Sequence, residues 1–589
     1  MLSVIVIWIY MFLTTFPIGY GIIYAVTGRT SYRVRHMDSY LVCGLAGVTV
    51  YAQFFSLFAK VGLAANLFLC AADLIVLWVC RRTLGKMLRE VWSDIRDNRS
   101  GKRGRMFIML FLFLLFAYGA SRGIIHYDTS LYHAQSIRWI EEYGVVKGLG
   151  NLHCRLAYNS SSFALSALYS MAFLGGQSYH CAAGWMAFLL AKICMEITGS
   201  FRCRRLRVSD FARVMGIYYL VIIFDEMVSP ASDYFMVLIA FYIVIRWLEL
   251  LEKKTGKITP YAMLCVLGVF LMTVKLSAAL VLLLVIYPAY YLLRRKRWKE
   301  IAGYLLLGIV TALPFFIRNV MLSGWLVYPF TQIDLFHVVW KIPKGMADYD
   351  AKEIQVWGRG YSDVNRYDLS MREWLPDWFR SLAGSDKLFV VLSAASVCIL
   401  LVYGVGLLCG FCKGRKDVLL VQATVAGSFL FWLCTSPLIR YGCVYVYLTP
   451  AVILGGIYED IVSAGESRLK AGQYDLNNGS SRISKAGQVL GNVVRWCGLV
   501  VMAFLVIYKC VALGREIVAS YVDDYWLVQK DYENYETDSY EINGVRFYYP
   551  VNGDQVGYDA FPSAPTKVEV RFLGQNIGDG FAELGAQGE

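Results

Sequence analysis

Long apolar runs separated by short polar segments repeat along the whole chain of 589 residues. A run of about 20 apolar residues can cross a bilayer as a helix, because a helix satisfies its own backbone hydrogen bonds. The pattern therefore predicts an all-α polytopic membrane protein with about fourteen transmembrane helices. The predicted helices lie near 4–25, 39–59, 61–80, 106–124, 179–198, 210–228, 232–249, 259–273, 276–292, 301–317, 388–411, 417–435, 441–457 and 491–512.

The composition supports this class. Hydrophobic residues make up 57% of the chain, charged residues only 17%, and the mean hydropathy is +0.49. A soluble domain carries about 25% charged residues. The first apolar run has no small-residue cleavage site behind it, so we expect a retained span rather than a removed signal. The 15 cysteines lie mostly inside apolar runs without metal-ligand spacing, which is typical of small buried hydrophobes.

The net charge of +13 comes from basic residues in short loops between the predicted spans. Basic loops between spans stay in the cytoplasm, where they set the topology and contact anionic lipids. These two roles explain the positive charge better than binding to nucleic acid does. The basic positions are Arg29, Arg33 and Arg35; Arg81, Arg82, Lys86, Arg89, Arg96, Lys102, Arg103 and Arg105; Arg202, Arg204, Arg205 and Arg207; Lys253, Lys254 and Lys257; Arg294, Arg295, Lys296 and Arg297; and Lys413, Arg415 and Lys416. We therefore predict a multi-pass membrane protein with both termini outside.

One apolar segment, 161–173, is too short for a span. If it crossed, the basic residues at 202–207 would fall outside. We therefore predict that it lies in the outer interface as an amphipathic or re-entrant helix.

The predicted topology divides the chain into three parts. Residues 1–105 form N-terminal spans with a basic cytoplasmic loop, and 106–513 form a transmembrane module. That module carries two outer loops, 126–178 and 318–387. In the tail, 514–589, VRFYYP (545–550) and KVEVRFL (567–573) alternate like short strands, which predicts a small β-rich outer cap.

The most polar segment directly follows the fourth span: HYDTSLYHAQSIRWIEEYGVVKGLGNLHCRLAYNSSSF, residues 126–163. Polar groups are costly at membrane depth, so a protein this apolar concentrates them where they act. A juxtamembrane helix from Ser130 to Glu141 would place Asp128 near its N-cap, and capping alone would explain that residue. The accompanying polar residues exceed what a cap needs, whereas Glu141 and Glu142 are expected on a solvated face. These accompanying residues are His126, Tyr132, His133, Arg138 and Arg155.

Four further polar positions fall at predicted span ends on the same outer side. Asp233 lies in SPASDYF (229–235), and Lys275 interrupts two apolar runs in TVKLS (273–277). Arg318 opens the second outer loop, and Arg440 lies in SPLIRYG (436–442). An arginine fork matches phosphate oxygens, although either arginine could instead extend to lipid headgroups.

An acidic residue on the first outer loop, followed by juxtamembrane helices and many spans, resembles the GT-C superfamily of membrane glycosyltransferases. Protein O-mannosyltransferases and lipid A aminoarabinose transferases belong to that superfamily. More closely, YDTSLYHAQSIRWIEEYGVVKGLGNLH and the tail motif GDQVGYDAFPSAPT resemble a group of uncharacterised bacterial membrane proteins placed with it. The resemblance covers roughly 106–580.

The resemblance implies transfer of a sugar from a polyprenyl-phosphate donor to a glycan, lipid or protein acceptor at the outer face. Asp128 matches the first-loop acid and would be the general base, and Asp233 matches a second acid. Lys275 would bind the donor phosphate, with Arg318 and Arg440 as further phosphate ligands. Five further residues would support the acceptor or the loop: His126, Tyr132, His133, Arg138 and Arg155.

Other classes of function remain open at this point. A lipid-linked glycan polymerase could use 318–387 as a late catalytic loop, and a flippase should carry charge along the length of its helices. A non-enzymatic membrane scaffold could use the tail to bind a partner. His126, His133 and His153 could bind a divalent metal, but their spacing fits no strong metal-ligand motif, so the sequence does not support a cofactor.

Overall fold

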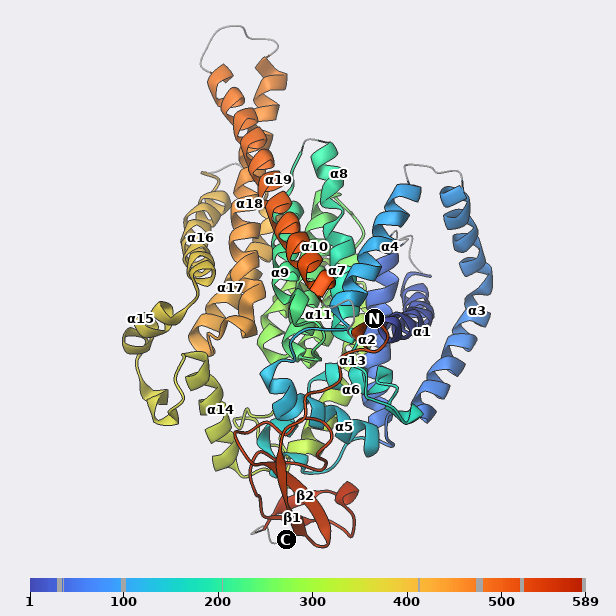
Figure 1. Cartoon of the computed structure of the whole chain (residues 1–589). Helices are drawn as coiled ribbons and strands as arrows, with labels where there is room; N and C mark the ends of the chain where they lie inside the picture. The colour runs from blue at the N-terminus through green and yellow to red at the C-terminus, as the bar shows by residue number, and fades with distance from the viewer. Residues whose placement is uncertain are drawn as a thin grey trace.

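The protein is a bundle of long helices with a small β-containing tail (Figure 1). The computed structural model describes residues 1–28, 34, 36–96, 102–203, 205–411, 414–472, 480–519 and 524–584. Five residues of the predicted basic loops, Arg29, Arg33, Arg35, Arg204 and Lys413, lie outside the described residues.

The α-helices in chain order are α1 (Leu2–Thr27), α2 (Met37–Ser56), α3 (Leu63–Arg96), α4 (Lys102–Gly119), α5 (Ala134–Glu142), α6 (Ser161–Tyr169), α7 (Ala182–Cys194), α8 (Ile197–Arg202), α9 (Val208–Ile222), α10 (Ser232–Glu252), α11 (Thr259–Val274), α12 (Ile286–Arg294), α13 (Trp298–Ser323), α14 (Lys344–Gly358), α15 (Met371–Ser381), α16 (Gly384–Cys409), α17 (Leu419–Thr435), α18 (Ile439–Gly472) and α19 (Ser480–Ala519). The site described below also includes one π-helix, η2 (Thr129–His133), and two 3₁₀-helices, η4 (Cys154–Tyr158) and η7 (Leu276–Val285).

Eleven helical segments of the described chain are long and apolar enough to cross a membrane, which confirms a polytopic membrane protein. Each of the fourteen predicted spans falls on helical residues, and the span at 276–292 is divided between η7 and α12. Three of the predicted spans, at α4, α9 and α11, are not among these eleven segments, and those helices have 18, 15 and 16 residues. The exact number of spans therefore stays a prediction.

The two ends of the bundle differ in character (Figure 1). At one end, here called the cap side, the tail lies against α5. The first residues of the chain contact the start of the tail, where the backbone N–H of Ser3 donates to the Leu527 carbonyl at 3.0 Å. The C-terminal end of α3, the N-terminal end of α4, the helix α8 and the far ends of α18 and α19 lie at the opposite end, here called the basic side.

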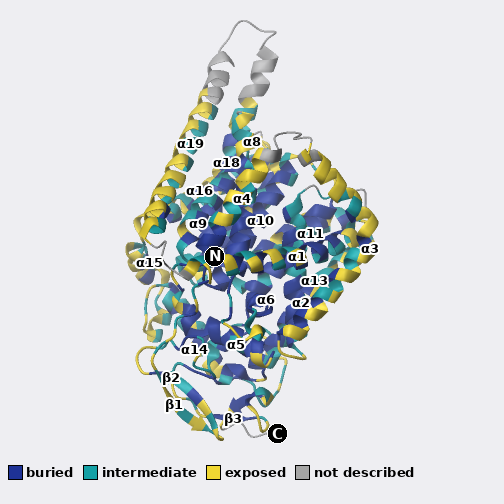
Figure 2. Cartoon of the chain, turned by 45° about the vertical axis from the view of Figure 1, so that its right-hand side comes forward, coloured by how far each residue is buried: buried dark blue, intermediate teal, exposed yellow. Residues whose placement is uncertain are grey.

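Helix α10 forms the centre of the bundle, and α3 and α19 lie at its periphery (Figure 2). Of the apolar windows that define these two outer helices, only 28% and 6% of the residues are buried, against 94% for α10. Helices α1 and α2 approach closely, because a Cβ atom at Gly44 would lie 1.7 Å from the Thr15 carbonyl oxygen. Small residues of this kind let transmembrane helices pack backbone to backbone.

The short apolar segment after residue 160 is not an amphipathic interfacial helix. All nine residues of α6 are buried, and the helix packs among α2 and α5. The Oγ atom of Ser160 accepts a hydrogen bond from the Ser162 N–H at the N-terminus of α6. An amphipathic helix at an interface exposes a polar face to water. Helix α6 exposes no such face, and its serines are buried inside the protein. A buried re-entrant position agrees with this packing.

The tail forms two small antiparallel sheets, as its alternating pattern predicted. Strands β1 (Thr537–Ile542) and β2 (Val545–Pro550) form a hairpin, and β3 (Val570–Phe572) pairs with β4 (Phe581–Glu583). Phe547 is fully buried, and its ring lies near the rings of Phe572 and Phe581. These aromatic contacts join the two sheets into one cap.

The arrangement makes the predicted orientation testable by cysteine labelling. Ser362 is exposed on the cap side, between α14 and α15, whereas Lys86 is exposed toward the basic-side end of α3. In intact cells an impermeant maleimide should label Ser362→Cys above the background of the native cysteines. Lys86→Cys should be labelled only after permeabilisation, because basic loops stay inside. The opposite pattern would reverse the orientation.

Candidate functional site

Four charged side chains from four helix ends meet on the cap side. Asp128 follows α4, Asp233 lies in the first turn of α10, Lys275 links α11 to η7, and Arg440 lies in the first turn of α18. We call these four residues the charge quartet. They are separated by up to 312 positions in the sequence, and all four were candidate site residues.

Asp128 pairs directly with Arg440. Nη2 of Arg440 donates to Oδ2 of Asp128 at 2.7 Å. Asp128 stands at the N-cap position of η2, but its side chain makes no capping hydrogen bond. The structure therefore offers ion pairing, not helix capping, as the role of this carboxylate.

Asp233 pairs with Lys275 on the other side of the quartet. Nζ of Lys275 donates to Oδ1 of Asp233, and Nε of Arg440 lies 3.9 Å from Oδ2 of the same carboxylate. Tyr441 lies beneath both cations. Its ring centroid is 3.9 Å from the Lys275 ammonium and 5.1 Å from the Arg440 guanidinium, which is cation–π distance. Sequence reasoning missed Tyr441, whose only signal was its place beside Arg440.

The quartet is asymmetric in exposure. The carboxylate side chains of Asp128 and Asp233 are only 10% and 8% exposed, whereas those of Arg440 and Lys275 are 29% and 23% exposed. Nε of Arg440 finds no hydrogen-bond partner within the described part of the chain. The two carboxylates are therefore the more buried members of the quartet, and the two cations are the more exposed ones.

Two histidines flank Asp128. The Asp128 backbone N–H donates to Nδ1 of His126 at 3.1 Å, and Nη1 of Arg440 lies 2.5 Å from Nε2 of the same ring. His133 contacts the Thr129 hydroxyl at 3.1 Å through Nδ1, and that hydroxyl lies 2.5 Å from Ser229 Oγ. These contacts fix the segment next to Asp128.

The electrostatics keep the acid charged and the histidines neutral. Burial raises the pKa of the Asp128 carboxyl, but Arg440 and, after it, His133, His126 and Arg155 together outweigh it, so the pKa lies below its usual value. Burial, followed by Arg440, lowers the pKa of His126. Burial lowers the pKa of His133 to about 3. At neutral pH Asp128 is therefore a carboxylate beside the Arg440 guanidinium, and the two imidazoles are uncharged. Burial also lowers the pKa of the Lys275 ammonium.

The remaining predicted residues lie outside the quartet. Arg318 is 3% exposed, and it donates to Oδ1 of Asn159 at 2.8 Å and to the Ser56 hydroxyl. It joins α13 to α2 and shares no described partner with Arg440. The Arg155 guanidinium stacks over the Trp357 ring at 4.4 Å, and Arg138 contacts the tail. The Tyr132 ring packs between His133 and Tyr158.

The expectation of a solvated Glu141 was wrong. This side chain is buried, and it accepts hydrogen bonds from the hydroxyls of Ser178 at 2.8 Å and Tyr558 at 2.5 Å. Burial raises the pKa of its carboxyl. Its neighbour Glu142 is exposed, as expected. The tail supplies Tyr558, and the local helical pattern around 141 contains no sign of that partner.

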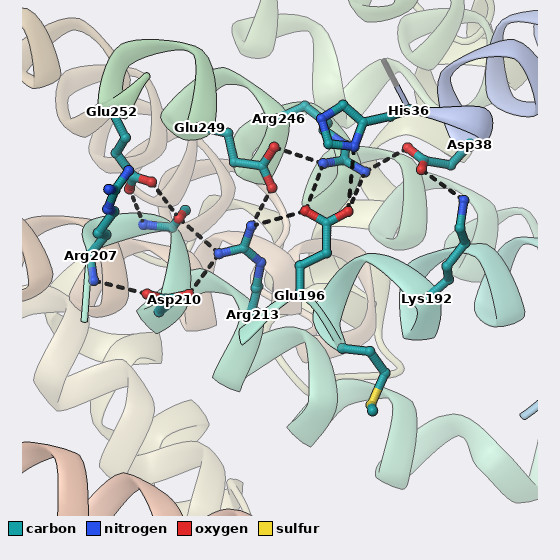
Figure 3. A network of polar contacts seen from close by, with 12 residues as sticks. His36, Asp38, Lys192, Glu196, Arg207, Asp210, Arg213, Arg246, Glu249 and Glu252 are labelled. Carbon is teal, nitrogen blue, oxygen red and sulfur yellow. Dashed lines mark hydrogen bonds and ion pairs between the residues drawn. The ribbon is translucent and has the colours of Figure 1, made fainter. Parts of the chain in front are cut away.

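A second charged cluster, which sequence reasoning also missed, lies at the basic side (Figure 3). Arg246 donates to Asp38 and Glu249 at 2.7 Å each, and Arg213 pairs with Asp210 at 2.7 Å. Within the described residues, the one group spaced to hold a metal ion is His36, Asp38 and Glu196. Arg246 and Lys192 already neutralise its carboxylates, so the cluster is an ion-pair network that joins α2, α7, α9 and α10.

The fold and the quartet define a polytopic membrane protein with a charged site at one end of its helix bundle. The chain belongs to a family described as a domain of unknown function, DUF8201, whose model matches residues 1–447. That range includes the whole quartet, and the tail lies beyond it. No curated protein and no solved structure matches the chain.

The Asp128–Arg440 pair should be visible in stability measurements. Arg440→Gln leaves a buried carboxylate without its cation, which should lower the free energy of unfolding by up to about 3 kcal/mol at pH 7. Adding Asp128→Asn should recover most of this loss, because no unpaired charge remains. Thermal unfolding in detergent measures both effects. The exposed pair Arg380–Asp377 provides the control, and Arg380→Gln should change stability by less than about 1 kcal/mol.

The pH dependence of this deficit follows from the pKa of Asp128. A carboxyl whose folded pKa is depressed stabilises the fold above its unfolded pKa, and this stabilisation is lost as the pH falls through the folded pKa. The deficit of Arg440→Gln should therefore persist at neutral pH and shrink below the usual aspartate range. A double variant no more stable than Arg440→Gln would contradict the pairing.

Proposed function

We propose that this protein is a membrane-embedded glycosyltransferase of the GT-C type. It would transfer a sugar from a polyprenyl-phosphate donor to a hydroxyl of a glycan, lipid or protein at the outer face of the bacterial cytoplasmic membrane. The charge quartet carries the proposal, because it places a shielded carboxylate next to two accessible cations at the end of apolar helices. Those are the groups that an inverting transfer from a lipid phosphate requires.

The cations suit the donor phosphate. The Lys275 ammonium and the Arg440 guanidinium both lie against the Asp233 carboxylate, so one phosphate group can reach both. Lys275 also begins the apolar segment 276–285, so a lipid chain can remain in the membrane while its phosphate contacts the site.

Asp128 is the proposed general base, with Asp233 orienting the acceptor or the base. The acceptor oxygen attacks the anomeric carbon, the bond from that carbon to the phosphate oxygen breaks, and Asp128 takes the hydroxyl proton. Polyprenyl phosphate leaves with the bonding electrons, and its growing charge is stabilised by Lys275 and Arg440. Arg440 lowers the pKa of the Asp128 carboxyl. When a phosphate binds Arg440 in place of Asp128, this pKa rises and Asp128 becomes a stronger base.

The position of the quartet favours a transferase over a flippase. A flippase needs polar groups along the whole path across the membrane, whereas the quartet gathers at the cap-side helix ends. One end of the bundle is the place where a lipid phosphate and a water-soluble acceptor can both arrive.

The role of Asp128 can be tested with one charge-neutral substitution. In membranes supplied with radiolabelled polyprenyl-phosphate hexose, Asp128→Asn should lower transfer by about 10²–10⁴-fold while the protein remains folded and inserted. Glu142→Gln is the matched control, since Glu142 is an exposed acid on the same segment. Equal turnover of Asp128→Asn and wild type would remove Asp128 from the mechanism and direct attention to Asp233.

A further inference from the structure

The tail contacts the segment that carries Asp128 along most of its length. Before Asp128, the Lys530 N–H donates to the Ser121 carbonyl at 2.7 Å, and Gln529 Nε2 donates to the Ala120 carbonyl at 2.8 Å. Lys530 Nζ also donates to the Gly123 carbonyl at 3.1 Å. The tail therefore holds the exit of α4, although it is more than 400 residues away in sequence.

Contacts with the tail also border Asp128 on both sides. The Tyr127 hydroxyl donates to Asp554, and Gln555 Nε2 donates to the Tyr127 carbonyl at 3.1 Å. The backbone N–H groups of Val556 and Gly557 both donate to the Ser130 carbonyl, at 3.0 and 2.9 Å. Backbone hydrogen bonds of this kind fix the chain on either side of the acid.

Two side chains of the same segment bind tail carbonyls in return. Gln135 is 1% exposed, and its Nε2 donates to the carbonyls of Gly557 and Ala560 at 2.9 Å each. Arg138 donates to the carbonyls of Tyr558 and Asp559 at 2.7 and 2.9 Å. Its guanidinium also lies over the rings of Tyr558 and Phe561, at 4.9 and 4.7 Å.

We propose that tail residues 554–560 are part of the functional site and hold the segment 127–138 so that Asp128 faces Arg440. Gln135 and Arg138 are the positioning residues of this arrangement. Among the described residues, the Asp128 carboxylate hydrogen-bonds to one side chain, that of Arg440, so its direction depends on the backbone that carries it. A displacement of about 1 Å at a reacting group can cost about 10²-fold in rate, which gives such positioning a measurable effect.

Gln135→Met tests this proposal. Methionine keeps the length and volume of the side chain and removes the donors to the tail, and Oε1 of Gln135 has no partner to lose in the described chain. Tyr549→Phe is the matched control, because it removes one tail hydrogen bond, to Asp538, that touches nothing in 120–141. A second pair, Arg138→Met against Arg138→Lys, covers the case in which Gln135→Met folds poorly, since lysine can still donate to a tail carbonyl.

Two readouts separate this inference from the proposed function. Hydrogen exchange of the amides in 126–138 requires no activity; it should be faster in Gln135→Met and Arg138→Met, and near wild type in Tyr549→Phe and Arg138→Lys. The kinetic readout rests on the proposed function: kcat should fall about 10-fold or more, with the donor KM little changed.

Equal exchange in Gln135→Met and Tyr549→Phe would overturn the positioning role, whatever the activity. Faster exchange with an unchanged kcat would show that the tail is only a structural support. Faster exchange in a protein without any transfer activity would leave the contact intact and reject the glycosyltransferase.

Discussion

The pairing of two carboxylates with two cations at the ends of four helices is the interaction on which the site depends. A single buried charge without a partner would be costly there, but two opposite pairs neutralise one another. The pairing also aligns the exit of α4 with the first turns of α10 and α18 and with the start of η7. Each helix end is therefore fixed by chemistry as well as by apolar packing.

The two charged clusters of the protein differ in how closed they are. In the basic-side network, the side chains of Asp38, Arg246 and Glu249 are 1%, 6% and 5% exposed, so the ions are paired and shielded together (Figure 3). In the quartet the acids are shielded and the cations are accessible. The first arrangement suits a network that holds helices together. The second suits a site in which the phosphate of a ligand can take the place of a carboxylate beside the cations.

Hydropathy and charge alone located every predicted span on helical residues. They also identified all four members of the quartet, because a polar residue at the end of an apolar run is conspicuous. The pattern could not show which of these residues meet. Arg318 resembled Arg440 in sequence context, yet it bonds Asn159 and Ser56 inside the bundle.

The tail contacts were beyond sequence reasoning for a similar reason. Glu141 and Arg138 lie on a helix whose local pattern indicates a solvated face, and their partners come from residues 558–561. Contacts between residues far apart in the chain produce no periodic pattern in the local sequence. The fully buried α6 shows the same limit, since a short apolar segment with serines has the same pattern at an interface and inside a bundle.

The central claim, that Lys275 and Arg440 form a lipid-phosphate site, is tested most directly by binding without turnover. Native mass spectrometry of the purified protein with polyprenyl phosphate, and with the matching polyprenyl alcohol, isolates the contribution of the phosphate. The account predicts that wild type prefers the phosphate, that Lys275→Met and Arg440→Gln lose this preference, and that Lys275→Arg recovers part of it. Equal binding of alcohol and phosphate by wild type, or an unchanged preference in both variants, would contradict it.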